Sequence, residues 1–119
     1  MGAMIEMKKD VLLVVNAVPS GRVVTYGSIA QFLGISPRHV AFILAGLNAQ
    51  EARTVPWHRV VSAGGWLNRD RKMGDGRQQF ELEKEGVTVK NQRLDLQSYQ
   101  VAIEGLPSGL KGGRIYRQA

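Results

Sequence analysis

The chain has 119 residues, a length that suits a single small domain with one modest core. Its 16 Lys and Arg against 10 Asp and Glu give a net charge of +6, which favours polyanionic partners such as nucleic acids because phosphate binding releases counterions. The absence of cysteine excludes disulfides, thiolate metal sites and a cysteine nucleophile, and no apolar run is long enough to cross a membrane.

The two ends of the chain differ in composition from its middle. Residues 1–5 show no secretory pattern and are expected to be a tag remnant or a disordered start, so an intracellular location is expected. Residues 105–119 are rich in glycine and basic side chains, have little to bury, and are expected to form a flexible tail. We therefore expect one folded domain over residues 6–104.

A first helix is predicted over residues 6–18. It carries valines at helical spacing on one face, namely Val11, Val14, Val15 and Val18. Pro19 and Gly21 end it, since proline disfavours a helical residue before it and glycine supports a turn. A short extended piece at residues 22–24 follows.

Two short helices then follow each other closely. Thr25 is a suitable N-cap for the first and Gly34 a suitable end. Ser36 and Pro37 open the second as N-cap and first helical residue. This second helix has an apolar face at i, i+3, i+4, i+7 spacing, formed by Val40, Ile43, Leu44 and Leu47. The pattern is that of a helix-turn-helix, although any helical hairpin of a small bundle has the same pattern.

The opposite face of this second helix carries Arg38, Ala41, Phe42 and Ala45. A positive residue at the helix start followed by small residues permits close approach to a nucleic-acid groove. Phe42 has two interpretations: it wedges against DNA, or it packs on a neighbouring loop.

The remainder of the chain is less regular. We expect a polar connection at residues 48–54, an irregular to extended stretch at 55–61, and a small hairpin turned by residues 63–65 toward Trp66 and Leu67. A charged loop covers residues 68–77. A last helix is predicted over residues 77–85, ending at Gly86, with extended pieces at 87–89 and 94–96.

Residues 56–60, Pro-Trp-His-Arg-Val, resemble the active-site segment of the O6-alkylguanine-DNA alkyltransferases, whose pattern is Pro-Cys-His-Arg-Val. Trp57 stands where those enzymes have their cysteine. That replacement is the mark of the alkyltransferase-like proteins, which resemble the DNA-binding domain of the repair enzymes but lack the acceptor thiol. Residues 24–27, 37–40 and 83–87 match further segments of the family in the same order, so the resemblance spans residues 11–89.

The resemblance implies a mainly α, winged-helix-like DNA-binding domain with a helix-turn-helix and a small β-hairpin. Its recognition helix is expected to enter the minor groove while the damaged nucleotide rotates out of the stack. The implied function is non-enzymatic: a monomer without a cofactor binds O6-alkylguanine in double-stranded DNA and flags it to nucleotide-excision repair proteins. The implied location is the cytoplasm, at the nucleoid, in a bacterium and the nucleus in a eukaryote.

Three residues receive the central roles from the resemblance. Tyr26 matches a tyrosine that crowds the phosphate beside the target nucleotide, and Arg38 matches the arginine that fills the stack after extrusion, which a planar, permanently charged guanidinium can do. Trp57 cannot replace a thiolate, because its indole nitrogen only donates a hydrogen, but its flat ring suits contact with a flipped purine. Each has an alternative interpretation: a half-buried tyrosine at a helix start for Tyr26, a surface phosphate contact for Arg38, and a core tryptophan for Trp57.

His58 and Glu85 match the family's proton relay. With no thiol to deprotonate, we expect this pair to be structural, with Arg59 adding hydrogen bonds. Only His39 and His58 are available as imidazole ligands, so no metal site is expected.

Further residues are implied around the base pocket. Leu44 and Val60 match positions that wall it, and Ala41 is expected at the groove. Arg69 and Arg71 lie in the loop that covers the pocket, where either one meets the edge of an alkylated guanine or binds phosphate.

The sequence also departs from the family. Ala41 and Phe42 replace a Gly-Gly pair, and Leu47 replaces an asparagine of the true alkyltransferases. The first departure favours an alternative function, a helix-turn-helix DNA-binding regulator without lesion specificity. A third hypothesis, an enzyme that uses Ser62 as its nucleophile, lacks an evident base.

Overall fold

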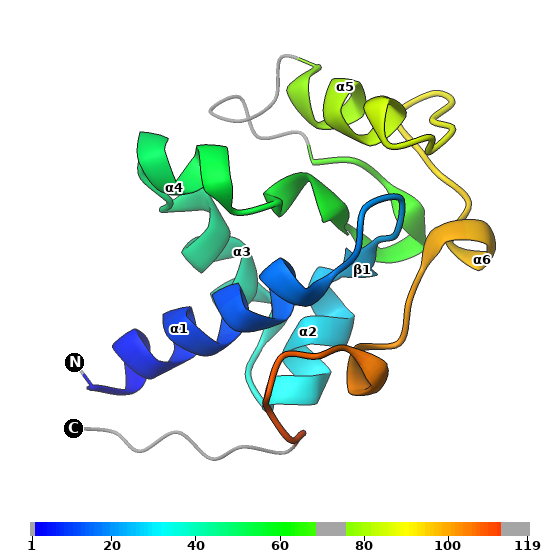
Figure 1. Ribbon diagram of the computed structural model, residues 1–119. Coiled ribbons are helices and arrows are strands. Elements are labelled where there is room, and N and C mark those ends of the chain that lie inside the picture. Colours follow the sequence, from blue (N-terminus) through cyan, green and yellow to red (C-terminus); the bar gives the residue numbers. More distant parts are fainter. Residues whose placement is uncertain (1, 69–75, 113–119) are drawn as a thin grey trace.

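The computed structural model describes residues 2–68 and 76–112 and is mainly helical, as predicted (Figure 1). Two short strands lie at Val24–Thr25 (β1) and Val60–Val61 (β2). The helices and 3-10 turns are Gly2–Ala17 (α1), Tyr26–Leu33 (α2), Pro37–Ala45 (α3), Ala49–Thr54 (α4), Trp57–Arg59 (η1), Ala63–Gly65 (η2), Arg77–Lys84 (α5), Leu96–Tyr99 (α6) and Ile103–Gly105 (η3).

Helices α2 and α3 form the predicted helix-turn-helix, and local capping fixes their ends. The Thr25 hydroxyl accepts a hydrogen bond from the Ser28 N–H, and the Ser28 hydroxyl returns one from the Thr25 N–H, which makes a capping box. Gly34 ends α2 in the left-handed conformation, at φ 75°. Ser36 then caps α3, with Pro37 as its first residue. These caps were predicted from the sequence.

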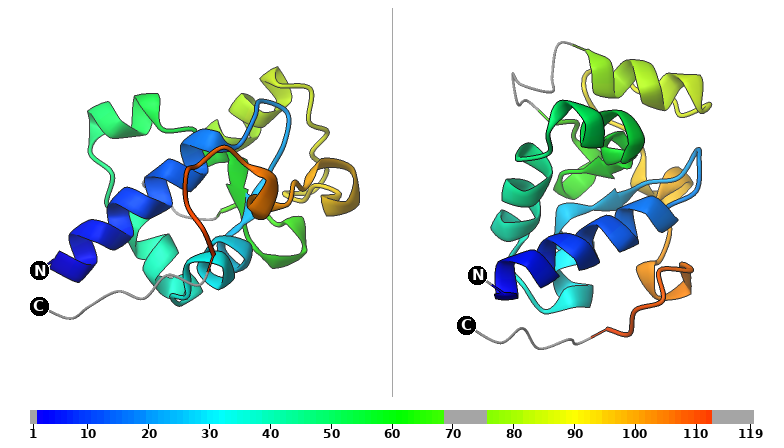
Figure 2. Two further views of the ribbon diagram at one scale, coloured as in Figure 1. Left: turned by 60° about the horizontal axis from the view of Figure 1, so that its bottom comes forward. Right: turned by 60° about the vertical axis from the view of Figure 1, so that its left-hand side comes forward.

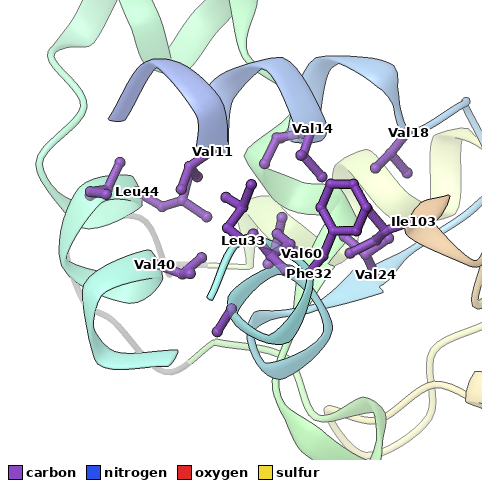
Figure 3. Close-up of a cluster of buried hydrophobic side chains, with 14 of the residues drawn as sticks. Val11, Val14, Val18, Val24, Phe32, Leu33, Val40, Leu44, Val60 and Ile103 are labelled. Atoms are coloured by element: carbon purple, nitrogen blue, oxygen red, sulfur yellow. The ribbon is translucent and has the colours of Figure 1, made fainter. Parts of the chain in front are cut away.

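The first core lies where α1 crosses α2 and α3 (Figure 2). Figure 3 shows Val11 and Val14 of α1, and Val18 directly after it, pointing toward α2 and α3. The four valines expected on the inner face of α1 are fully buried, and so are Val40, Ile43 and Leu44 of α3, while Leu47 is only partly buried. The apolar spacing of the two helices therefore predicted this core correctly.

A two-stranded parallel sheet separates this core from a second one. Val24 pairs with Val60, and both side chains belong to the first core. Because side chains alternate across a strand, the neighbouring residues Val23 and Val61 face the opposite way. They join a second cluster with residues of α5 and the segment after it, such as Leu82. The described residues thus form two hydrophobic clusters where one core was expected.

The β-hairpin expected at residues 63–65 takes a different form. The chain does turn there, since the Ser62 N–H donates to the Trp66 carbonyl at 2.8 Å. However, β2 pairs in parallel with β1, and Trp66 pairs instead with Arg93. A Cβ at Gly65, whose φ is +90°, would collide with the Leu94 carbonyl, so glycine is required where the later segment crosses. The tight antiparallel turn lies further on, between Lys90 and Arg93.

Three boundaries also differ from the prediction. Helix α1 begins at Gly2, so residues 2–5 extend a helix that was expected to start at residue 6. Residues 49–54 form helix α4 where a polar connection was expected, because Asn48 and Glu51 make a capping box that the sequence pattern contains. In the expected tail, Leu106 and Leu110 pack against the first core, whereas residues 113–119 lie outside the described part.

Candidate nucleic-acid interface

A pocket of about 560 Å³ opens between the start of α2, the outer face of α3 and the segment around β2. Its volume lies within the range usual for ligand sites. It is lined by Tyr26, Gly27, Pro37, Arg38, Ala41, Leu44, Ala45, Trp57, Ser62, Ala63 and Asn68. Small apolar side chains dominate this wall, so a flat, largely apolar group fits it well.

Parallel pairing of the two strands explains why distant segments meet at this pocket. Thr25 pairs with Val61, and the chain leaves both strands at the same edge. Tyr26, the residue after β1, and Ser62, the residue after β2, therefore both reach the pocket. Tyr26 is also the first residue of α2, directly after the Thr25 cap, and it is half-buried.

Helix α3 contributes the charged and the small side chains of the pocket. Because Ser36 and Pro37 fix the helix start, Arg38 is the second residue of α3, and it is exposed at the pocket. Ala41 and Ala45 follow on the same face and leave its surface open. Leu44 closes the wall from the core side, since it is 3% exposed.

Trp57 forms a fixed wall of this pocket. The residue is 5% exposed, and its indole N–H donates to the Ala52 carbonyl of α4 at 3.1 Å. The His58 ring meets it nearly edge-on, with 6.3 Å between the centroids. Although Trp57 is buried, it is among the residues that line the open pocket, and its only hydrogen-bond donor is already used.

His58 and Glu85 lie on the other side of Trp57, in a network with Arg59. The Glu85 carboxylate contacts His58 Nε2 at 2.7 Å and accepts hydrogen bonds from Arg59 Nε and Nη2. It also accepts one from the Gly21 N–H at 2.9 Å, and Arg59 Nη1 donates to the Val18 carbonyl. The network thus ties the end of α1 and the following turn to η1 and the end of α5.

These contacts decide the charge of Glu85. Burial opposes its ionisation, but hydrogen bonds from Arg59, from the Gly21 N–H and from His58 outweigh that effect and lower the pKa of Glu85 to about 2. His58 and Glu85 line a separate cavity of about 260 Å³ and are not among the residues of the larger pocket. The geometry is that of a structural ion-pair network.

The sequence located much of the pocket, with exceptions. Tyr26, Arg38, Ala41, Leu44 and Trp57 come together there. Val60 does not line the pocket, because its side chain points into the first core and is fully buried. The Val60 carbonyl accepts a hydrogen bond from Gln78 Nε2. Arg69 and Arg71 lie outside the described residues.

Sequence reasoning missed several lining residues. Ala63 and Asn68 carry no motif of their own, and the pairing of β1 with β2 brings their segment to the pocket. Gly27 belongs to the matching segment at residues 24–27 but was not assigned to the pocket. The hydrogen bond from Trp57 to Ala52 of α4 was missed as well. The capping-box spacing of Asn48 and Glu51 was a usable signal for this helix.

Two further features bear on chemistry. Ser62 lines the pocket, but His58 and Glu85 bond each other, and Glu85 also bonds Arg59, instead of serving as its base. In the same described part, no group of three or more His, Asp or Glu residues is placed to hold a metal ion. Over residues 2–68 and 76–112, no helix is both long and apolar enough to span a bilayer.

The helix-turn-helix and the pocket beside its second helix define a DNA-binding class of protein. Residues 6–87 match the model of the family described as 6-O-methylguanine DNA methyltransferase, DNA binding domain. Because the match covers more than half of the chain, the chain belongs to this family.

Named relatives agree with this membership. The chain is 38% identical to alkyltransferase-like protein 1 of Schizosaccharomyces pombe over 74 residues, which make up 60% of this chain and 68% of that protein. It is 40% identical to the DNA base-flipping protein of Escherichia coli over 91 residues, 73% of this chain and 67% of that protein. The crystal structure of S. pombe Atl1 in complex with damaged DNA containing O6-carboxymethylguanine matches with a TM-score of 0.73 and 34% identity, over 81% of this chain and 94% of that one.

Proposed function

We propose that this chain recognises O6-alkylated guanine in double-stranded DNA by rotating the damaged nucleotide into the pocket beside Trp57, and that it leaves the alkyl group in place. The observation that carries the proposal is the open pocket shared by the exposed face of α3, the start of α2 and Trp57. A lesion with a weakened base pair costs less to extrude than an intact base, which gives selectivity before any contact in the pocket.

The pocket suits binding and lacks the chemistry of alkyl transfer. Transfer to protein needs a nucleophile such as a thiolate, and the chain has no cysteine. The Trp57 indole presents a flat apolar ring for stacking, and its N–H is held by Ala52. Glu85 is committed to Arg59, Gly21 and His58, so the former relay stabilises the fold instead of activating a group.

Docking of the duplex follows from the position of α3. Because the exposed face of α3 lines the pocket, a duplex that delivers a base there must lie against that face. Ala41 and Ala45 allow close approach to the minor groove. The exposed position of Arg38 at the pocket supports the proposal that its guanidinium fills the gap left in the stack. Tyr26, at the start of α2, crowds the phosphate of the extruded nucleotide.

The relatives support this function. One is named a DNA base-flipping protein, and the structural neighbour from S. pombe is bound to damaged DNA containing O6-carboxymethylguanine. We further propose that the chain acts as a monomer that flags the lesion to nucleotide-excision repair proteins. It would do so in the cytoplasm, at the nucleoid, of a bacterium or in the nucleus of a eukaryote.

Binding to matched duplexes with and without one O6-methylguanine tests the proposal. We expect tighter binding to the damaged duplex at every salt concentration, because charge contacts are common to both duplexes and cancel in the ratio. Trp57→Ala should reduce this ratio. Trp66→Ala, at an exposed tryptophan outside the pocket, serves as the matched control, and thermal unfolding verifies that both variants fold.

Two outcomes would contradict the proposal. Equal affinity for the two duplexes, with a preference for one undamaged sequence, would instead identify a helix-turn-helix regulator. Loss of the methyl group from the DNA, or its appearance on the protein by mass spectrometry, would identify an enzyme.

A further inference from the structure

Phe42 is the most exposed large apolar side chain of the described residues. It lies on α3 and is 69% exposed, whereas Phe32 on α2 is 7% exposed and belongs to the first core. The sequence left open whether Phe42 packs on a neighbouring loop. Its exposure shows that no described loop packs on the ring, since a ring packed on a loop would be largely covered.

Phe42 stands beside the pocket on the helix that a duplex must approach. Arg38, Ala41 and Ala45 of α3 line the pocket, and Phe42 follows Ala41 directly and Arg38 by four residues. Residues four apart share one face of a helix, so the ring projects from the same side of α3 as the Arg38 side chain. A duplex seated against this face therefore meets the phenyl ring.

Because the ring carries no charge or hydrogen-bonding group, it cannot bind phosphate. An apolar side chain that meets a minor groove acts instead as a wedge between base pairs, which unstacks one step and kinks the duplex.

We propose that Phe42 inserts into a base-pair step near the lesion and makes binding depend on how easily that step unstacks. The inference rests on the proposed function for the placement of the duplex against α3. It adds a second specificity to lesion recognition, namely for the sequence beside the damaged nucleotide.

The spacing along α3 places the step. Four residues of helix rise span about 6 Å, and base pairs stack at about 3.4 Å. With α3 laid along the duplex, the ring therefore enters within roughly two steps of the nucleotide replaced by Arg38. Steps such as TpA unstack easily, whereas ApA steps in A-tracts are stiff. A TpA step two base pairs from the lesion, on the side that Phe42 reaches, should therefore be preferred.

Duplexes with O6-methylguanine and either TpA or ApA at that distance, on each side in turn, test the inference. For the native chain we expect roughly fivefold to tenfold tighter binding with TpA on one side only. 2-Aminopurine at that step should brighten on binding as it unstacks, and fluorescence energy transfer between the duplex ends should report a larger bend.

Three variants separate the wedge from other effects. Phe42→Ser should remove the TpA preference, the 2-aminopurine signal and part of the bend, while Phe42→Leu keeps an apolar wedge and most of all three. Phe80→Ala, at a phenylalanine of α5 that is 60% exposed and outside the pocket, should change none of them.

The result distinguishes this inference from the proposed function. If Phe42→Ser still prefers damaged DNA but binds and bends all duplexes like the native chain, the wedge is refuted while lesion recognition stands, and Phe42 serves a protein contact instead. If the native chain ignores the lesion yet the Phe42-dependent TpA preference remains, the wedge stands and lesion recognition fails.

Discussion

The two sides of Trp57 use their side chains in opposite ways. On one side, His58, Arg59 and Glu85 satisfy one another in a half-buried network that joins α1, η1 and α5. On the other side, Arg38 and the alanines of α3 surround open space. Within the short segment Trp57–Arg59, Trp57 thus lines the open pocket, while His58 and Arg59 belong to the network.

The contacts of His58 and Glu85 agree with the expectation that this pair, which matches the family's proton relay, is structural here. Together with Arg59, the pair holds three segments together. The indole of Trp57 separates the two sides and is itself fixed by Ala52. Substitutions in the network should therefore mainly lower the free energy of unfolding, and substitutions at the pocket should mainly weaken lesion binding.

The largest effect is expected when the network is broken. Glu85→Ala leaves Arg59 half-buried without its carboxylate, and breaking such a pair costs about 3–5 kcal/mol of the free energy of unfolding. Urea unfolding measures the loss. Glu83→Ala, two residues away on the exposed side of α5, is the control and should cost far less. Equal losses for the two variants would mean that the network does not anchor the fold.

Acid should weaken the same network in the native chain. Because the pKa of Glu85 is lowered from 4.5 to about 2, its contribution is complete above pH 4.5 and is lost as the pH falls toward 2. That contribution is at most roughly 3 kcal/mol, from the size of the shift. From pH 5 to pH 2, the free energy of unfolding should fall more steeply for the native chain than for the Glu85→Gln variant. Parallel curves would contradict the assignment.

On the pocket side, Arg38→Ala should weaken binding to the O6-methylguanine duplex by about 1–3 kcal/mol, the range for one specific contact, because the vacated stack is no longer filled. Its effect on stability should be small, since Arg38 is exposed. Arg38→Lys is the control: it keeps the charge but not the planar group, so it should recover the salt-dependent part of binding only. Full recovery by lysine would reduce Arg38 to a phosphate contact.

The smallest effect is expected for Trp57→Phe, which touches both sides at once. It removes the hydrogen bond to Ala52, worth about 1 kcal/mol, and keeps an aromatic wall at the pocket. Stability should fall modestly, while the ratio of affinities for damaged and undamaged duplexes should stay close to that of the native chain. A collapse of that ratio would show that the indole, and not simply an aromatic ring, reads the lesion.

Local signals in the sequence predicted the helical half of the molecule well. Thr25, Gly34 and Ser36 were identified as caps because each acts within a few residues of itself, and the valines of α1 were identified from their period. The same kind of signal precedes α4, where Asn48 and Glu51 have capping-box spacing. The hairpin was misplaced because the partner of Trp66 is Arg93, which no local pattern indicates.

The sequence by itself determined the helix-turn-helix, the absence of a nucleophilic thiol and five of the residues that line the pocket, namely Tyr26, Arg38, Ala41, Leu44 and Trp57. Only the tertiary structure decided that β1 and β2 pair in parallel, which brings Tyr26 and Ser62 to one edge. It also decided that the Val60 side chain lies in the core and that Phe42 is exposed on α3. The reason is physical. Caps and helical faces depend on near neighbours, whereas register and burial depend on which distant surfaces pack together.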